Sequence, residues 1–199
     1  MFVMKRRIVL TLALAGGMAC LTSVFKAQTA VDPALPRFGA NNELMRPENY
    51  REWVYLSSGL GMSYNEAATA ANNGNPVFDN VFVTPAAYRS FLQTGQWPDR
   101  TMFVLELRAS ASEGSINRQG RFQGPVVSLE VEVKDESRFP GKWAFYNFGR
   151  SAPSAQPLPA TANCYTCHAQ NGAVDNTFVQ FYPTLADIAR QKGTFRNTP

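Results

Sequence analysis

Histidine and cysteine are scarce in this sequence: His168 is its only histidine, and its three cysteines are Cys20, Cys164 and Cys167. A zinc site built on Cys164 and Cys167 needs two further ligands, and one histidine cannot supply both. The chain also has little excess charge outside residues 1–30. Of the 19 basic residues, four lie in that segment, which has no acidic residue, and the other 15 are balanced by 15 acidic residues. This balance argues against a nucleic-acid partner, and we expect none.

The first thirty residues have the pattern of an export signal. A basic stretch at residues 5–7 precedes an apolar stretch at residues 8–21, which is short for a transmembrane helix. Small residues follow, and we expect cleavage near Ala27 or Ala30. Residues 1–30 are therefore predicted to be a signal peptide that directs the protein to the periplasm. The alternative is that they stay attached as an N-terminal membrane anchor.

The most informative stretch is residues 164–168, which read Cys-Tyr-Thr-Cys-His and match the attachment motif of c-type haem. In this motif two thiols bond to the haem vinyl groups and the histidine supplies the proximal iron ligand. We therefore predict one covalently attached haem c on Cys164 and Cys167, with its iron on His168. The competing interpretation is a thioredoxin-like dithiol or a simple disulfide. Such dithiols usually open a βαβ unit, whereas this pair lies near the C-terminus behind a proline-rich loop.

The sixth coordination position of the iron separates the function classes. Electron-carrier cytochromes usually fill it with methionine or a second histidine, and this chain has no second histidine. Met62 and Met102 are the internal candidates, followed by Met45, although an ordinary core or loop methionine is the favoured interpretation of each. We therefore expect five-coordinate iron that binds small ligands such as NO or CO. The alternative is an electron-transfer cytochrome with a methionine as sixth ligand.

The hydrophobic pattern predicts a single haem c-binding domain at residues 47–199, preceded by an N-terminal arm at residues 31–46. In residues 127–133, valine and leucine alternate with polar side chains, which is typical of a strand with one buried and one wet face. The other strands predicted in this way lie at residues 78–83, 101–109 and 143–148.

Proline and glycine mark the boundaries of the predicted helices. Two helices are expected to begin at Pro85 and Pro183 and to end before Gly95 and Gly193. A short helix capped by Thr161 is expected to carry the motif cysteines. Less regular segments are predicted as a helix through residues 47–53 and a loop or short irregular helix at residues 57–76. Strands with separate helices indicate an α+β fold, a mainly antiparallel β-sheet with a few helices around one covalently attached c-type haem.

Further stretches extend the likeness to haem proteins beyond this motif. They are Asn49-Tyr50-Arg51-Glu52-Trp53-Val54, Trp143-Ala144-Phe145-Tyr146, Leu158-Pro159 and Phe181-Tyr182-Pro183-Thr184-Leu185. In this order around the motif, they resemble the cytochrome P-460 family over residues 43–187. The resemblance implies a mostly antiparallel sheet with one c-type haem, usually in a homodimer. One branch of that family oxidises hydroxylamine and has a lysine-to-haem crosslink, and the cytochrome c-prime-beta branch lacks the crosslink and binds NO and CO.

The position of the crosslinking lysine decides which branch the chain resembles. That lysine lies on a strand just before a Glu-Leu pair, and Leu105 stands there in this sequence, before Glu106. The resemblance is therefore closer to the c-prime-beta branch. The lysines outside residues 1–30 do not match the position; they are Lys134, Lys142 and Lys192.

Two glutamates lie close to this strand position. Alternation places Glu106 on the opposite face from Leu105, so we expect a solvated or structurally paired carboxylate there. Glu130 matches a family glutamate, and alternation points it away from the packed face; a role as distal proton acceptor is the alternative. Candidates for an apolar wall of the ligand pocket, each of which fits the general core better, are Phe78, Phe82, Phe103 and Phe145.

Together these features predict an exported mono-haem c-type cytochrome that binds small gaseous ligands. An oxidoreductase acting on hydroxylamine or a related small nitrogen compound is the alternative, and no catalytic residue is assigned. The expected partners are a small diatomic or nitrogenous ligand, a redox partner protein and a second copy of the chain in a homodimer.

Overall fold

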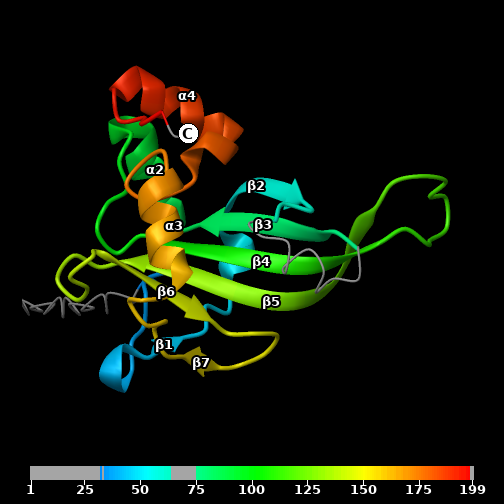
Figure 1. The fold of residues 1–199 in the computed structure, drawn as a ribbon, viewed down its shortest axis with the longest axis horizontal. Coiled ribbons are helices and arrows are strands. Elements are labelled where there is room, and N and C mark those ends of the chain that lie inside the picture. Colours follow the sequence, from blue (N-terminus) through cyan, green and yellow to red (C-terminus); the bar gives the residue numbers. More distant parts are fainter. Residues whose placement is uncertain (1–31, 33, 64–74, 198–199) are drawn as a thin grey trace, which may run out of the picture. The chain divides into compact units, whose positions relative to one another are not determined.

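Five antiparallel strands form the main sheet of the computed structural model, which describes residues 32, 34–63 and 75–197 (Figure 1). Neighbouring strands follow in sequence order, β2-β3-β4-β5-β6, as a meander. Their bounds are β2 (Val54–Leu60), β3 (Val77–Val83), β4 (Met102–Ala111), β5 (Phe122–Lys134) and β6 (Trp143–Asn147). A second sheet pairs the short strands β1 (Leu44–Met45) and β7 (Ser154–Ala155). The predicted α+β class with mainly antiparallel sheet is confirmed.

The chain also forms helices, two of which begin at a proline and end before a glycine. The described helices are α2 (Pro85–Thr94), α3 (Asn163–Asn171) and α4 (Pro183–Lys192), with 3-10 turns η1 (Ala40–Asn42), η2 (Tyr50–Glu52) and η3 (Val179–Phe181). Both α2 and α4 have a proline in the first turn and end at a glycine with φ of 70°, Gly95 and Gly193. Proline suits the first turn, and glycine adopts left-handed backbone without steric cost. The predicted bounds of these two helices are confirmed.

Side chains of β5 alternate between the two faces of the sheet, and other parts of the chain cover both faces. Leu129, Val131 and Val133 are at most 2% exposed and belong to a core that includes residues of the N-terminal segment. Glu130 and Glu132 point to the other face, on whose side α2, α3 and α4 lie (Figure 1). The face of β5 that was predicted to be wet therefore lines a cavity whose opposite wall includes α3.

The edge strand β2 differs most from the prediction. A loop was expected from residue 57 and a helix through residues 47–53, whereas β2 continues to Leu60 and is preceded only by the turn η2. The run Ser-Ser-Gly at residues 57–59 has weak strand propensity, so its conformation depends on pairing with β3, across a register shift after Tyr55. Residues 64–74 of the predicted loop lie outside the described residues.

The segment predicted as an N-terminal arm, residues 31–46, contributes to the core where it is described. Leu44 is fully buried, and its partner across the β1-β7 pair is Ala155. The predicted signal peptide at residues 1–30 lies outside the described residues. In the part of the chain that the structure describes, no helix has both the length and the apolar character needed to cross a membrane.

Candidate functional site

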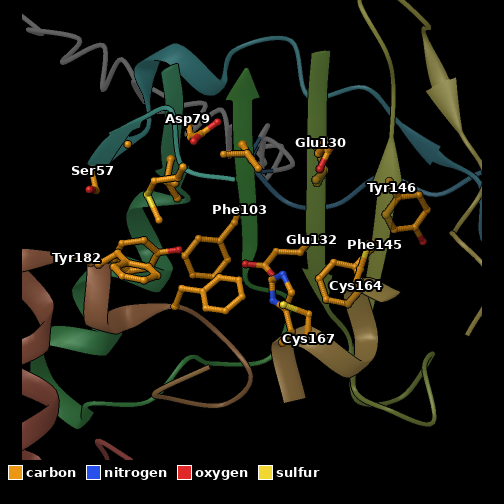
Figure 2. A pocket seen from close by; sticks show the side chains of 18 of the residues that line it. Ser57, Asp79, Phe103, Glu130, Glu132, Phe145, Tyr146, Cys164, Cys167 and Tyr182 are labelled. Atoms are coloured by element: carbon orange, nitrogen blue, oxygen red, sulfur yellow. The ribbon is translucent and has the colours of Figure 1, made fainter. Parts of the chain in front are cut away.

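A cavity of about 330 Å³ lies between the sheet and the chain segment that contains α3 and η3 (Figure 2). Cofactor and ligand sites in proteins typically have volumes of roughly 300–1,000 Å³. Strands β2 to β6 provide one wall, and residues 158–182 provide the other. The described residues that line it are Ser57, Gly59, Met62, Asp79, Val81, Phe103, Leu105, Glu130, Val131, Glu132, Phe145, Tyr146, Leu158, Asn163, Cys164, Cys167, His168, Phe178, Phe181 and Tyr182.

Helix α3 brings the three predicted site residues together on the wall of this cavity. Cys164, Cys167 and His168 stand at positions i, i+3 and i+4, which share one face of an α-helix. All three line the cavity, and the two cysteines form no disulfide. The N-cap of α3 is Ala162, with no side-chain hydrogen bond, so the predicted cap by Thr161 is wrong.

The environment of the thiols does not suit a redox dithiol. Burial raises the pKa of the Cys164 thiol, and the carboxylate of Glu130 raises it further. Reactive dithiols need surroundings that stabilise the thiolate and lower its pKa. The cavity therefore disfavours the thioredoxin-like interpretation. In the described ranges, no three His, Cys, Asp or Glu side chains are grouped so that they could hold a bare metal ion.

His168 is held with one ring nitrogen bonded and the other available. Its Nδ1 lies 2.9 Å from the carbonyl oxygen of Asn176 and 3.2 Å from Oε2 of Glu132. The N–H is aligned with the carbonyl, so Glu132 Oε2 has no aligned donor. Burial would lower the pKa of His168, but Glu132 and the Asn176 carbonyl outweigh burial, and the pKa is raised. With the proton on Nδ1, Nε2 is the nitrogen left to bind a metal.

The segment that carries Asn176 is fixed from several sides. Gly172 leaves no room for a side chain, because an added Cβ would lie 2.6 Å from the carbonyl carbon of Asn176. Asp175 and Asn176 both have left-handed backbone, with φ of 46° and 61°. The buried Lys134 binds Asp175 through an Nζ–Oδ2 contact of 2.6 Å. These contacts hold the Asn176 carbonyl in place against His168.

Leu105 and Glu106 lie on opposite faces of β4, as alternation predicted. Leu105 lines the cavity, and the fully buried Glu106 accepts hydrogen bonds from Tyr50 at 2.5 Å and Arg108 at 2.6 Å, and a further one from Arg51. Burial would raise the pKa of Glu106, but the bonds from Arg108 and Tyr50 hold it below its usual value. Glu106 is therefore a structurally paired carboxylate.

Only one of the three methionines considered as iron ligands is among the described lining residues, Met62. Met102 is buried in the core on the other face of the sheet, and Met45 lies in β1. The aromatic candidates divide in the same way: Phe103 and Phe145 line the cavity, Phe82 belongs to the opposite core, and Phe78 is not a described lining residue.

Two carboxylates of the cavity were not expected from the sequence, Asp79 and Glu132. Asp79 is 9% exposed, and its Oδ2 has no hydrogen-bond partner among the described residues. Burial, with a further contribution from Glu130, raises the pKa of Asp79 to about 6. Burial also raises the pKa of Glu130, which lines the cavity as well. The sequence signal for Asp79 was weak, because it stands beside a second polar residue, Asn80, inside a strand that is otherwise apolar.

The chemistry of these residues fits a haem. Two thiols and one imidazole share a helix face, aromatic rings line the cavity beside them, and Nε2 of His168 is the free donor. An antiparallel sheet that carries such a donor set defines a class of protein, the haem-binding cytochromes.

Comparison with known families gives the narrower assignment. The sequence profile described as Cytochrome P460 matches residues 47–179, which is more than half of the chain. The chain belongs to the cytochrome P460 family, and it is therefore a cytochrome that binds haem and iron. No curated protein sequence matches the chain significantly.

Proposed function

We propose that the protein is an exported mono-haem c-type cytochrome with five-coordinate iron that binds small ligands such as NO or CO. The observation that supports this most directly is the grouping of Cys164, Cys167 and His168 on one helix face, in a chain with no other histidine. Haem bound there would supply an iron with one axial position filled by His168 and the other open to a ligand.

The proximal residues are arranged to hold an imidazole rigidly. The rings of Phe145 and Phe178 have their centroids 4.5 and 4.4 Å from that of His168. Together with the Asn176 carbonyl, they restrict rotation of the imidazole and keep its tautomer fixed. Residues that contact a metal-binding histidine normally fix the orientation of its ring in this way.

Val81, Phe103 and Leu105 form an apolar part of the cavity wall, which is bordered by the carboxylates Asp79 and Glu130. Apolar side chains offer no hydrogen bond to a bound ligand, and such surroundings favour neutral diatomic molecules. Met62 is the one described lining methionine, so an electron-transfer cytochrome would have to use it as sixth ligand. This alternative predicts low-spin ferrous iron that does not respond to CO.

The c-prime-beta branch is supported by the residue at the crosslinking position. Leu105 lines the cavity but has no amine. The described lining residues include no lysine at all. Lys134 is bound to Asp175, and Lys142 lies 3.4 Å from Glu136 in an exposed ion pair. We therefore propose that the haem has two thioether links and no lysine crosslink.

A second candidate function is oxidation of hydroxylamine or a related small nitrogen compound. It is favoured by Asp79 and Glu130, because both carboxyl groups line the cavity and have raised pKa values. A carboxyl group with a pKa near the working pH is suited to accept protons from a substrate. Turnover with hydroxylamine and an artificial electron acceptor separates this function from simple ligand binding.

Export and partners follow from the same proposal. Attachment of c-type haem takes place outside the bacterial cytoplasm, which agrees with the signal-like pattern of residues 1–30. We propose a periplasmic protein that forms a homodimer and exchanges electrons with a redox partner protein. Size-exclusion chromatography with light scattering tests the dimer, and analysis of the N-terminus of the exported protein tests cleavage.

Two measurements on the purified haem protein test the main proposal. Acid–acetone extraction should leave the haem on the chain, and the Cys164→Ala, Cys167→Ala double variant should release it. Reduced optical spectra should change on addition of CO, and ferric EPR should show high-spin iron. Extractable haem in the unaltered protein would show that covalent attachment is wrong. A ferrous spectrum that CO leaves unchanged would show a filled sixth position, and Met62→Ala would then restore the response if Met62 is the ligand.

A further inference from the structure

The haem cavity has an unbalanced charge. Its described lining residues include three carboxylates, Asp79, Glu130 and Glu132, and neither lysine nor arginine. Nearby cations are engaged elsewhere: Arg108 binds Glu106 on the other face of the sheet, and Lys134 binds Asp175. No lysine or arginine of the described cavity wall therefore neutralises this negative charge.

The three carboxylates have different surroundings. Glu132 approaches the imidazole of His168, with Oε2 at 3.2 Å from Nδ1, so its charge acts on the proximal side. Among the described residues, neither Asp79 nor Glu130 forms an ion pair or a hydrogen bond with the imidazole, although the charge of Glu130 still acts on His168 and Cys164. Figure 2 shows both projecting from the sheet in the part of the cavity away from Cys167. Asp79 and Glu130 are therefore the two described carboxylates of the cavity that have no direct contact with the proximal imidazole.

Sheet register places Asp79 and Glu130 on the same face, with Leu105 between them. Val81, Leu105 and Glu130 are partners across β3, β4 and β5, and Asp79 is two residues from Val81. Asp79 is nine-tenths buried, and in the described part of the chain its Oδ2 has no hydrogen-bond partner. A buried carboxylate without a hydrogen bond is costly, and a second negative charge brought close to it would be repelled through surroundings of low dielectric constant.

We propose that Asp79 and Glu130 select the ligand class of this haem: the cavity accepts small neutral or cationic molecules and rejects anions. Neutral NO and CO enter without repulsion, whereas azide, fluoride and nitrite do not. A cationic amine-type compound also enters, and its nitrogen must lose a proton before it can bind the iron. A ligand with an N–H or O–H group would also give Asp79 Oδ2 the donor that it lacks. This inference deepens the proposed function and rests on it, since it concerns ligands of the iron in the same cavity.

Ligand titrations of the ferric haem protein at pH 8 test the selection. Azide serves as the anion and nitric oxide as the neutral ligand, and binding is followed by optical spectra. Asp79→Asn and Glu130→Gln keep side-chain size and remove one charge each. Asp187→Asn is the matched control, because Asp187 is 77% exposed on α4 and does not line the cavity.

Each cavity substitution should raise azide affinity by about tenfold, which is the effect of a unit charge at roughly 12 Å in a medium of effective dielectric constant about 20. The double variant should gain more than either single variant. Nitric oxide affinity should change by less than about twofold, and Asp187→Asn should change neither. A double variant with unaltered azide affinity overturns the proposal. So does an equal gain for azide and nitric oxide, because access rather than charge would then be the cause.

Failure of the proposed function and failure of charge selection give different results. If the function fails through Met62 ligation, the unaltered protein has a low-spin spectrum that CO does not change. The same azide comparison is then made in a Met62→Ala background, where the open position is available. If Asp79→Asn and Glu130→Gln raise azide affinity in the Met62→Ala background, the inference holds even though the unaltered protein would be an electron carrier. If they leave azide affinity unchanged there, the inference is overturned.

Discussion

Oε2 of Glu132 lies 3.2 Å from Nδ1 of His168, beside an N–H that is aligned with the Asn176 carbonyl. The side chain of Glu132 is 11% exposed, so its charge is only partly screened by water. Contacts of this kind increase the basicity of a metal-bound imidazole and stabilise the more positive state of the metal. Glu132 should therefore favour ferric over ferrous iron.

Glu132→Gln is expected to raise the reduction potential of the haem, because it removes a negative charge next to the proximal imidazole. Each tenfold change in the ferric-to-ferrous equilibrium corresponds to about 59 mV for one electron. Spectroelectrochemical titration measures the shift, and the Raman frequency of the ferrous iron–histidine stretch should fall. Asp187→Asn is the control, since Asp187 is an exposed carboxylate on α4 that pairs with Arg190 and does not line the cavity. Equal shifts in the two variants would show that the contact with His168 has no special effect.

Asp79 should make the protein less stable as pH rises, whereas a carboxylate in an ion pair makes a protein more stable as pH rises. Burial first, and then Glu130, raise the pKa of Asp79 to about 6 from the model-peptide value of 3.8. Between these values the folded state binds more protons than the unfolded state. The free energy of unfolding therefore falls as pH rises from about 4 to 6, by an amount on the order of 1–3 kcal/mol.

Asp79→Asn removes this titration and should stabilise the protein above pH 6 by a similar amount. Urea unfolding at pH 4 and pH 7.5 measures the difference, which should be small at the lower pH. Loss of stability at pH 7.5 would mean that the carboxylate has a partner in the haem-bound protein that compensates for its burial.

Gly172→Ala should loosen the segment that orients His168. An added Cβ would lie 2.6 Å from the carbonyl carbon of Asn176 and 2.7 Å from the carbonyl oxygen of His168, and backbone atoms cannot move aside at little cost. Overpacking of this kind costs roughly 1–3 kcal/mol. Chemical denaturation should show this loss, with a change in the iron–histidine Raman band. Gly141→Ala is the control, because no heavy atom lies within 4 Å of a Cβ there.

The helices α2, α3 and α4 and most strands could be predicted because their signals are local, whereas the helix expected through residues 47–53 is only the turn η2. Proline and glycine fix the ends of α2 and α4, and alternation reveals β3, β4, β5 and β6. The strand β2 could not be predicted, since residues 57–59 carry no strand preference and depend on pairing with β3. Non-local pairing of this kind leaves little trace in a short window of sequence.

The site was predictable on the helix and not on the sheet. A fixed spacing along α3 specifies Cys164, Cys167 and His168, whereas the opposite wall depends on which strands are neighbours. Glu132 was interpreted as part of a wet face, because alternation separates two faces of a strand but does not show what covers each. Met102 was a candidate iron ligand because alternation does not show which face of β4 borders the cavity. The structure places Met102 in the core on the opposite face of the sheet.

Leu105→Lys tests the branch of the family directly. In the unaltered protein, mass spectrometry of haem-bearing peptides should show the mass of two thioether links only, because leucine has no nucleophile. The variant places an amine in the cavity next to Glu130, the cross-strand partner of position 105. A buried lysine costs stability, but this carboxylate would offset part of the cost. The variant should therefore fold with reduced stability. When a two-electron oxidant such as hydrogen peroxide is added, to take up the two hydrogens lost as an N–C bond replaces an N–H and a C–H bond, an amine that reaches the haem edge would form a third covalent link and give a red-shifted spectrum and hydroxylamine oxidation. Leu105→Met is the control, with similar volume and no amine, and should keep the unaltered spectrum. A third link in the unaltered protein, through Lys134, Lys142 or another residue, would contradict the assignment to the branch without a crosslink.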